Sequence, residues 1–275
     1  MRLPPPIRNR GGFTILEMLI AMSVFLIICA AMFGLLQMSQ TRYASENQLS
    51  GSFQEARLAI DQIVRDVNVA GYPSLSLYSS IPTDASMYAV GPVAWSPNYY
   101  PSAGCAIGTA GGGTCTSPGD FDLIVETRLG SDTSVSWVRY YLSGTTLYRA
   151  VAPKTTGADP TAATSSPGVA VPFLVNVMNN PGGGQLAQIT ATYPTMFPGG
   201  VPQPIFQYMC DSAAGSTGNP TQPVPCPAAG AYNLPQNISD VDVTLIVATP
   251  QRDQQTQMLK LVELNGRGHT LNLPQ

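Results

Sequence analysis

Apolar residues form one long uninterrupted stretch near the start of the chain. Between Phe13 and Leu36 the polar side chains are only those of Thr14, Glu17 and Ser23. About 24 helical residues, at about 1.5 Å each, are enough to cross a bilayer. The pattern predicts a membrane helix over residues 13–38 with one carboxylate, that of Glu17, inside it.

A second helical pattern follows directly, in which apolar residues recur at spacings of three and four. They are Leu49, Phe53, Ala56, Ile60, Ile63, Val67 and Ala70. The other faces of this helix carry Glu55, Asp61, Gln62, Arg65 and Asp66. Gly71-Tyr72-Pro73 supplies a stop. We therefore expect one helix from Thr14 to Ala70, whose amphipathic half covers residues 39–72.

The remainder, residues 73–275, has the pattern of a β-rich globular domain with long loops. Strand-like runs cover residues 121–128, 135–142, 146–151, 169–177, 186–193, 205–210, 241–249 and 258–264, and Ser143-Gly144 indicates a hairpin. Stretches rich in Pro, Gly, Ser and Thr cover residues 73–119, 153–168 and 194–236. The prediction is an α+β fold in which an antiparallel sheet buries one face against the apolar stripe of residues 49–70.

The flanks of the apolar run separate it from an ordinary signal peptide. Arg2, Arg8 and Arg10 precede the run without any acid, so this end is expected to stay in the cytoplasm. A signal peptide has its small-residue cleavage site after the apolar run. Here the small pair Gly11-Gly12 comes before it, and only Cys29-Ala30-Ala31 offers a weak alternative.

Glu17 has two interpretations. A carboxylate in lipid costs several kcal/mol unless it is paired. Thr14-x-x-Glu17 fits a capping box at a helix start. Alternatively, if the chain begins at Phe13, the carboxylate of one helix can meet the terminal amine of a neighbouring helix, and each charge then compensates the other.

The segment Gly12-Phe13-Thr14-Ile15-Leu16-Glu17 resembles the processing site of type IV prepilins and pseudopilins. The resemblance implies that a prepilin peptidase removes the leader, residues 1–12, by cutting after Gly12. Phe13 would then be the N-methylated first residue, and Glu17 the assembly residue at the fifth position. It also implies a single-pass inner-membrane protein with a cytoplasmic N-terminus and a periplasmic domain, which later enters a cell-surface filament with other major and minor pilins or pseudopilins.

Later parts of the chain resemble particular branches of this family. Residues 59–72 look like the end of the long helix in W-type minor pilins, and residues 140–142 with 147–149 are similar to their first hairpin. J-type pseudopilins of type II secretion share much of this pattern. The resemblance implies a minor pilin that is assembled into a type IV pilus or primes it. The alternatives are a type II secretion pseudopilin and a membrane-anchored binding protein that does not polymerise.

The five cysteines separate into one residue in the helix and two close pairs. Cys29 lies in the apolar run, where a thiol behaves as a small hydrophobe. We expect local disulfides between Cys105 and Cys115 and between Cys210 and Cys226, although four cysteines permit three connectivities. Zinc is the competing interpretation, but the chain has no Cys-x-x-Cys and a single His.

Composition and motifs argue against catalysis, a cofactor or a general nucleic-acid surface. Only 11% of residues are charged, and removal of residues 1–12 takes three of the 13 basic residues, leaving ten against 16 acidic ones, a net charge of −6. The single His, His269, lies close to the last residue, and neither glycine run, 111–113 or 182–184, precedes Lys-Ser/Thr. Asp120/Asp122 and Asp240/Asp242 are candidates for calcium, but strand-edge acids are commoner, so no cofactor or metal is expected.

Overall fold

The computed structural model describes residues 12–80, 82–94, 116–154, 169–210, 224–226, 238–254 and 256–271. Contacts divide the chain into two units, residues 1–47 and residues 48–275. In the first unit the described secondary structure is the N-terminal part of helix α1, Ile15–Asn68. The helix confirms the predicted one, beginning one residue later than expected and ending two residues earlier.

The helix ends because the chain turns sharply after it. Gly71 has a φ of 79°, in the left-handed region that glycine adopts without steric cost. Its amide donates to the carbonyl of Glu126 at 2.7 Å, which joins the turn to the first strand. The predicted stop at residues 71–73 is therefore confirmed, and the turn carries the chain onto the sheet.

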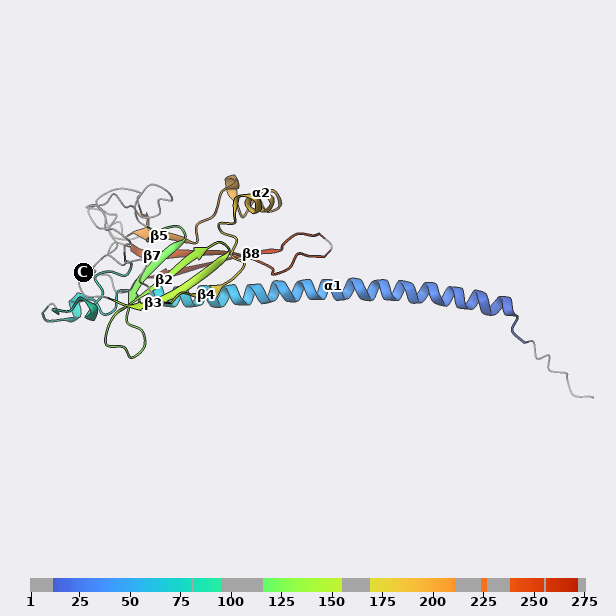
Figure 1. The fold of residues 1–275 in the computed structure, drawn as a ribbon, viewed down its shortest axis with the longest axis horizontal. Coiled ribbons are helices and arrows are strands. Elements are labelled where there is room, and N and C mark those ends of the chain that lie inside the picture. The colour runs from blue at the N-terminus through green and yellow to red at the C-terminus, as the bar shows by residue number, and fades with distance from the viewer. Residues whose placement is uncertain are drawn as a thin grey trace, which may run out of the picture. The chain divides into compact units, whose positions relative to one another are not determined.

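Two four-stranded antiparallel sheets form the framework of the second unit (Figure 1). The first has the order β1-β2-β3-β4, with β1 Asp122–Thr127, β2 Ser136–Ser143, β3 Thr146–Pro153 and β4 Val171–Leu174. The second has the order β6-β5-β7-β8, with β5 Phe206–Cys210, β6 Val224–Pro225, β7 Ile238–Ala248 and β8 Leu261–His269. Shorter helical elements are η1 Leu75–Leu77, η2 Ala85–Met87, α2 Gly183–Thr192 and η3 Pro198–Gly200.

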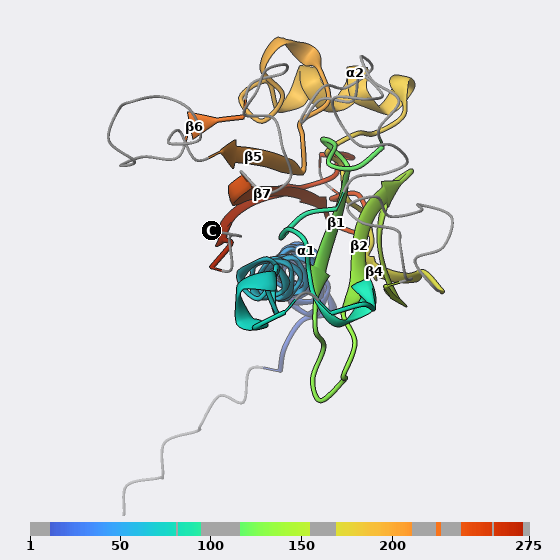
Figure 2. The same ribbon diagram turned by 90° about the vertical axis from the view of Figure 1, so that its left-hand side faces the viewer.

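The α+β class is confirmed, and the sheet is divided in two where one had been expected. The β2–β3 hairpin has the predicted register, since Ser143 pairs with Thr146 and Gly144 takes a φ of 60°. Figure 2 looks along the C-terminal part of α1, which lies between β7 and β1. Ala56, Ile63 and Val67 are fully buried in the core that the two sheets share with this part of the helix.

The buried face of α1 differs from the predicted stripe. Phe53 is 41% exposed and Leu49 only half-buried, whereas Ser52 and Asp66 are buried. Five of the predicted residues, Ala56, Ile60, Ile63, Val67 and Ala70, are buried as expected, and Ala59 joins them. Small side chains let the sheets approach the helix backbone closely, so size as well as hydrophobicity decides which face is covered.

Glycine in β8 provides the closest of these approaches. A Cβ at Gly266 would lie 2.4 Å from Cγ2 of Ile60, and one at Gly268 would lie 2.7 Å from Cβ of Val67. These glycines interrupt the apolar alternation, which explains why the predicted strand at residues 258–264 lies several residues before the observed one. At the other sheet, β4 covers only the middle of the predicted strand at residues 169–177.

The predicted strand at residues 186–193 is wrong, because this segment belongs to helix α2. Its β-branched residues suggested a strand, but Leu186, Ile189 and Tyr193 also follow the three- and four-residue spacing of a helix. They pack on Ile246 and Ala248 of β7, forming a second apolar cluster. In Figure 2, α2 lies on the side of this sheet away from α1.

Candidate processing and assembly site

Gly12 and Phe13 lie just ahead of the first helical turn. Neither residue is helical, and α1 begins at Ile15. The Phe13 side chain is 89% exposed, and a Cβ at Gly12 would meet no atom within 4 Å. A peptide bond in this non-helical, accessible setting can enter a protease active site without unwinding the helix.

Glu17 takes part in a capping box at the start of α1. Its Oε2 accepts hydrogen bonds from the Thr14 amide at 2.9 Å and the Thr14 hydroxyl at 3.0 Å. The Glu17 amide donates back to Thr14 Oγ1 at 3.3 Å. The capping interpretation therefore describes the isolated chain, in which these bonds satisfy amides that the helix start leaves without intrahelical partners.

The N-terminal part of α1 exposes almost every apolar side chain. Ile15, Leu19, Phe25 and Phe33 are all more than 60% exposed. The helix is long and apolar enough to cross a membrane. Cys29 lies within this stretch as a free thiol. An apolar surface of this size is typically shielded from water by lipid or by other helices.

Cys210 and Cys226 form a disulfide that ties the end of β5 to the residue after β6. This is the local pairing that the sequence predicted. The other predicted pair, Cys105 and Cys115, lies outside the described residues.

Three of the carboxylates considered for calcium contact side chains of neighbouring strands. Asp122 forms a bidentate pair with Arg139 of β2. Asp240 and Asp242 of β7 pair across to β8, with His269 at 3.0 Å and with Arg267. Among the described residues, no group of three or more His, Cys, Asp or Glu side chains is arranged to hold a metal ion.

Burial raises the pKa values of two carboxylates at and just before the start of β1. It raises the pKa of Asp122 to about 6, against the opposing effect of Arg139. Burial also raises the pKa of Asp120. The free-energy cost of removing a carboxylate from water thus exceeds the favourable interaction with one guanidinium here.

Two buried polar clusters were not anticipated from the sequence. Asp66 of α1 accepts hydrogen bonds from Tyr140 of β2 and Arg149 of β3. Glu126 of β1 accepts from Lys154 Nζ at 3.1 Å and from Trp137 Nε1 at 2.9 Å. Each cluster ties separate elements together, and the partners come from positions too distant in sequence for spacing to reveal.

Comparison with known proteins gives one match, at the N-terminus. Residues 7–33 match the family model for the prokaryotic N-terminal methylation motif. No curated protein matches the chain, and no solved structure does.

The matched residues coincide with the site described above. They include the accessible junction at Gly12 and Phe13, the capped Glu17 and the first half of the exposed apolar helix. A motif of this kind marks a pilin-type substrate of prepilin peptidase that assembles with other pilins. The chain therefore carries a type IV pilin-like prepilin segment at its N-terminus.

Proposed function

We propose that this protein is a minor type IV pilin-like subunit, processed after Gly12 and assembled into, or priming, a surface filament. The observation that carries the proposal is the position of Glu17 in an apolar helix directly after an accessible Gly12–Phe13 junction, all within the matched motif. The protein acts as a structural subunit and not as an enzyme.

Assembly requires Glu17 to exchange one partner for another. In the isolated chain its carboxylate accepts from Thr14. Processing creates a positive amine at Phe13, one helical turn away from Glu17. In a bundle of apolar helices, the amine of one subunit compensates the carboxylate of the next, and the low dielectric makes an unpaired charge unfavourable. The ion pair between the Phe13 amine and Glu17 of a neighbouring subunit therefore fixes how far the two helices are shifted along their axes.

The β-rich domain is consistent with a minor subunit. Residues 48–275 form one unit built on two sheets, much more than a membrane anchor needs. The hairpin of β2 and β3 occurs where the resemblance to W-type minor pilins implies it. The role that we propose is surface fibre biogenesis, with adhesion, motility or DNA uptake as its purpose.

The experiment combines mass spectrometry of the mature N-terminus with complementation. We expect a chain that begins at methylated Phe13, and retention of the leader in a Gly12→Val variant. A chain beginning after Ala30 or Ala31 would contradict the proposal.

Variants of Glu17 test assembly separately from folding. Glu17→Val should leave the precursor in the membrane and the domain folded, while incorporation with partner pilins is lost. Glu17→Gln keeps the size and the acceptor oxygen but loses the charge, so it should be defective if the ion pair matters. Normal assembly of Glu17→Val would reduce this residue to a helix cap and favour a non-polymerising anchor.

A pseudopilin of a type II secretion system is the second candidate, because the hairpin resemblance extends to J-type pseudopilins. Deletion of the gene distinguishes the two. Loss of surface fibres supports the pilin, and loss of export of folded proteins with fibres intact supports the pseudopilin.

A further inference from the structure

Strand β8 lies at the edge of the second sheet, where β7 is its neighbour. The Thr270 amide donates to the carbonyl of Ser239 at 2.8 Å, so the even-numbered residues of this ladder turn their backbone groups toward β7. The odd-numbered residues turn theirs away from the sheet. One of them, His269, donates its amide to Asn68 Oδ1 of α1 at 2.9 Å.

The next three amides along this edge are free. Within the described residues, the amides of Glu263, Asn265 and Arg267 have no hydrogen-bond acceptor, and their carbonyls have no donor. A buried backbone group without a partner is unfavourable, so these groups face solvent. The three side chains are exposed as well. The edge of β8 therefore presents a row of alternating donors and acceptors.

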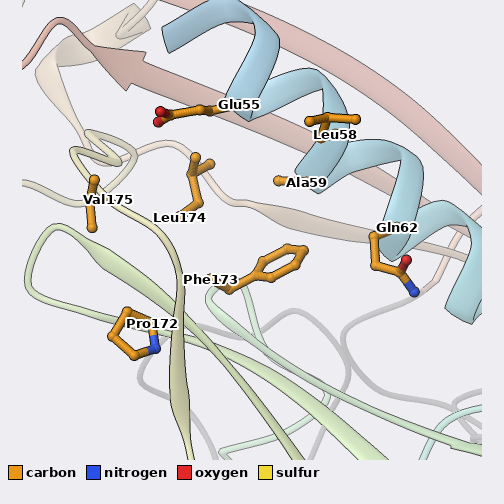
Figure 3. A pocket seen from close by; sticks show the side chains of 8 residues that line it. All are labelled: Glu55, Leu58, Ala59, Gln62, Pro172, Phe173, Leu174 and Val175. Carbon is orange, nitrogen blue, oxygen red and sulfur yellow. The ribbon is translucent and has the colours of Figure 1, made fainter. Parts of the chain in front are cut away.

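The other described sheet edges are closed to strand addition. Residues 92–94 cover β1, where the Ala94 amide donates to the carbonyl of Ile124 at 2.9 Å. β4 has four residues and contains Pro172, which Figure 3 shows on the side of the strand away from α1. β6 has two residues, one of them Pro225. Short strands and prolines are common devices against edge-to-edge pairing.

β8 has neither of these devices. It pairs with β7 over nine residues, without a bulge and without a proline. A long regular edge of this kind is a template for another strand. An extended peptide is the ligand that fits it, because an added strand matches the backbone groups in spacing and direction.

The side chains of the edge set a charge preference. Arg267 is neutralised by Asp242 of β7 at 2.8 Å. Glu263, in contrast, lies opposite Ile246 of β7 and pairs with no cation among the described residues. Opposite charges on neighbouring strands stabilise their pairing. An added strand therefore gains most from a basic residue opposite Glu263.

A second copy of this chain fits the edge less well. Antiparallel pairing of two β8 strands about Asn265 would bring opposite charges together. However, β8 runs in the same direction as the end of α1, since Gly266 approaches Ile60 and Gly268 approaches Val67. The two-fold pair would thus point the membrane-leading ends of the two helices in opposite directions. Neighbours anchored in one membrane have these ends on the same side.

We propose that the free edge of β8, residues 263–267, binds an extended segment of another protein as an added β-strand, with a basic side chain of that segment opposite Glu263. The interaction uses the backbone of the folded domain and requires neither processing after Gly12 nor the ion pair of Glu17. Failure of this proposal therefore leaves the proposed function unaffected.

Hydrogen exchange of individual amides tests whether the edge is free and whether it becomes occupied. In the purified full chain in detergent, the amides of Glu263, Asn265 and Arg267 should exchange at least about tenfold faster than those of Leu264 and Gly266, which face β7. In complexes extracted from native cells, the same three amides should become protected. Slow exchange of all five amides in the purified chain would mean that a segment of the chain itself occupies the edge. Unchanged fast exchange in the complexes would mean that nothing binds there, and either result overturns the proposal.

Photo-crosslinking in native cells identifies the occupant. Replacement of Arg267 by p-benzoylphenylalanine should give a crosslink to an extended segment of another protein, mapped by mass spectrometry. The matched control is the same replacement of Gln207, an exposed residue of β5 in the interior of the same sheet, which should give no such crosslink. A crosslink from position 267 to a second copy of this chain, to a helix of a partner or to nothing would overturn the proposal.

Substitutions at the edge test whether the crosslink depends on the backbone. Asn265→Pro removes a free amide and leaves the ladder with β7 intact, so it should reduce the crosslink yield at least about tenfold. Asn265→Ala keeps the amide and should change the yield less than about twofold. Glu263→Lys should also reduce the yield, because it places a cation opposite the basic residue. Equal yields from the Pro and Ala variants would contradict strand addition, and if Asn265→Pro lowers the melting temperature, the exchange measurement decides.

Discussion

Asp66 of α1 accepts a hydrogen bond from the hydroxyl of Tyr140 of β2 at 2.6 Å, across 74 residues of sequence. The Asp66 side chain is only 5% exposed, and it also accepts hydrogen bonds from Arg149 of β3 at 2.9 Å and from the Gln62 amide at 2.8 Å. Burial raises the pKa of Tyr140, so its hydroxyl stays protonated and donates. The carboxylate thereby connects the helix to two neighbouring strands of the first sheet.

Removal of this carboxylate should destabilise the domain more than removal of one donor. Asp66→Ala leaves the Arg149 cation and the Tyr140 hydroxyl without their acceptor and should cost about 3–5 kcal/mol of unfolding free energy. Tyr140→Phe removes the hydroxyl that donates to Asp66 and accepts from Arg149 Nε, and should cost about 1–2 kcal/mol, since the Asp66–Arg149 ion pair remains. Urea unfolding of the detergent-solubilised chain measures both. Equal effects of the two variants would show that the ion pair adds nothing to the hydrogen bond.

The buried pair of Lys154 and Glu126 should show strong coupling. Their side chains are 0% and 2% exposed, and Lys154 Nζ also donates to the carbonyl of Tyr88. Lys154→Met leaves a buried carboxylate without its cation and should cost about 3–5 kcal/mol, whereas adding Glu126→Gln to it should recover part of the loss. A double-mutant cycle of unfolding free energies gives the coupling. Additive losses would mean that the two charges act independently.

A side chain at Gly266 should destabilise the domain, because Ile60 occupies the space next to it. Gly266→Ala should cost about 1–3 kcal/mol, because the new methyl group would overlap Cγ2 of Ile60. The matched control is Gly51→Ala, a helix position without atoms within 4 Å, which should be neutral or stabilising by up to about 1 kcal/mol. Melting temperatures compare the two. Ile60→Ala should restore part of the stability of Gly266→Ala, and failure to do so would place the strain elsewhere.

Asp122 should make stability fall as the pH rises. Its folded pKa, about 6, lies above the ordinary value of 3.8. The folded state therefore binds the proton more tightly, and the stability gained is fully present below about pH 4 and lost as the pH passes about 6. The change is at most about 3 kcal/mol.

Asp122→Asn isolates this contribution, because it removes the titrating group and leaves Asp120 in place. The unfolding free energy of the wild type minus that of the variant should decrease between pH 4 and pH 7. A difference that stays constant, or increases, would show that Arg139 holds the pKa of Asp122 at or below its ordinary value.

The sequence by itself determined the features that depend on neighbouring residues. The leader, the Gly12–Phe13 junction and Glu17 in its apolar run are local patterns, and a methylation-motif family model matches the same segment. The limits of α1 follow from helical periodicity and from Gly71, and the β2–β3 hairpin from two apolar runs around Ser143-Gly144. These features can be predicted from the sequence because the interactions that stabilise them involve residues only a few positions apart.

Only the tertiary structure decided which surfaces meet. The sequence placed Asp66 on a polar face of the helix, but in the structure Asp66 is buried against Tyr140 and Arg149. The sequence also placed residues 186–193 in a strand, but this segment is a helix that packs on β7. The division into two sheets and the contact of Gly266 with Ile60 depend equally on partners far away in sequence. The desolvation of a buried charge is compensated only by a partner that packs against it, and tertiary packing can also override β-propensity. In both cases the partner lies far away in sequence, so no local pattern identifies it.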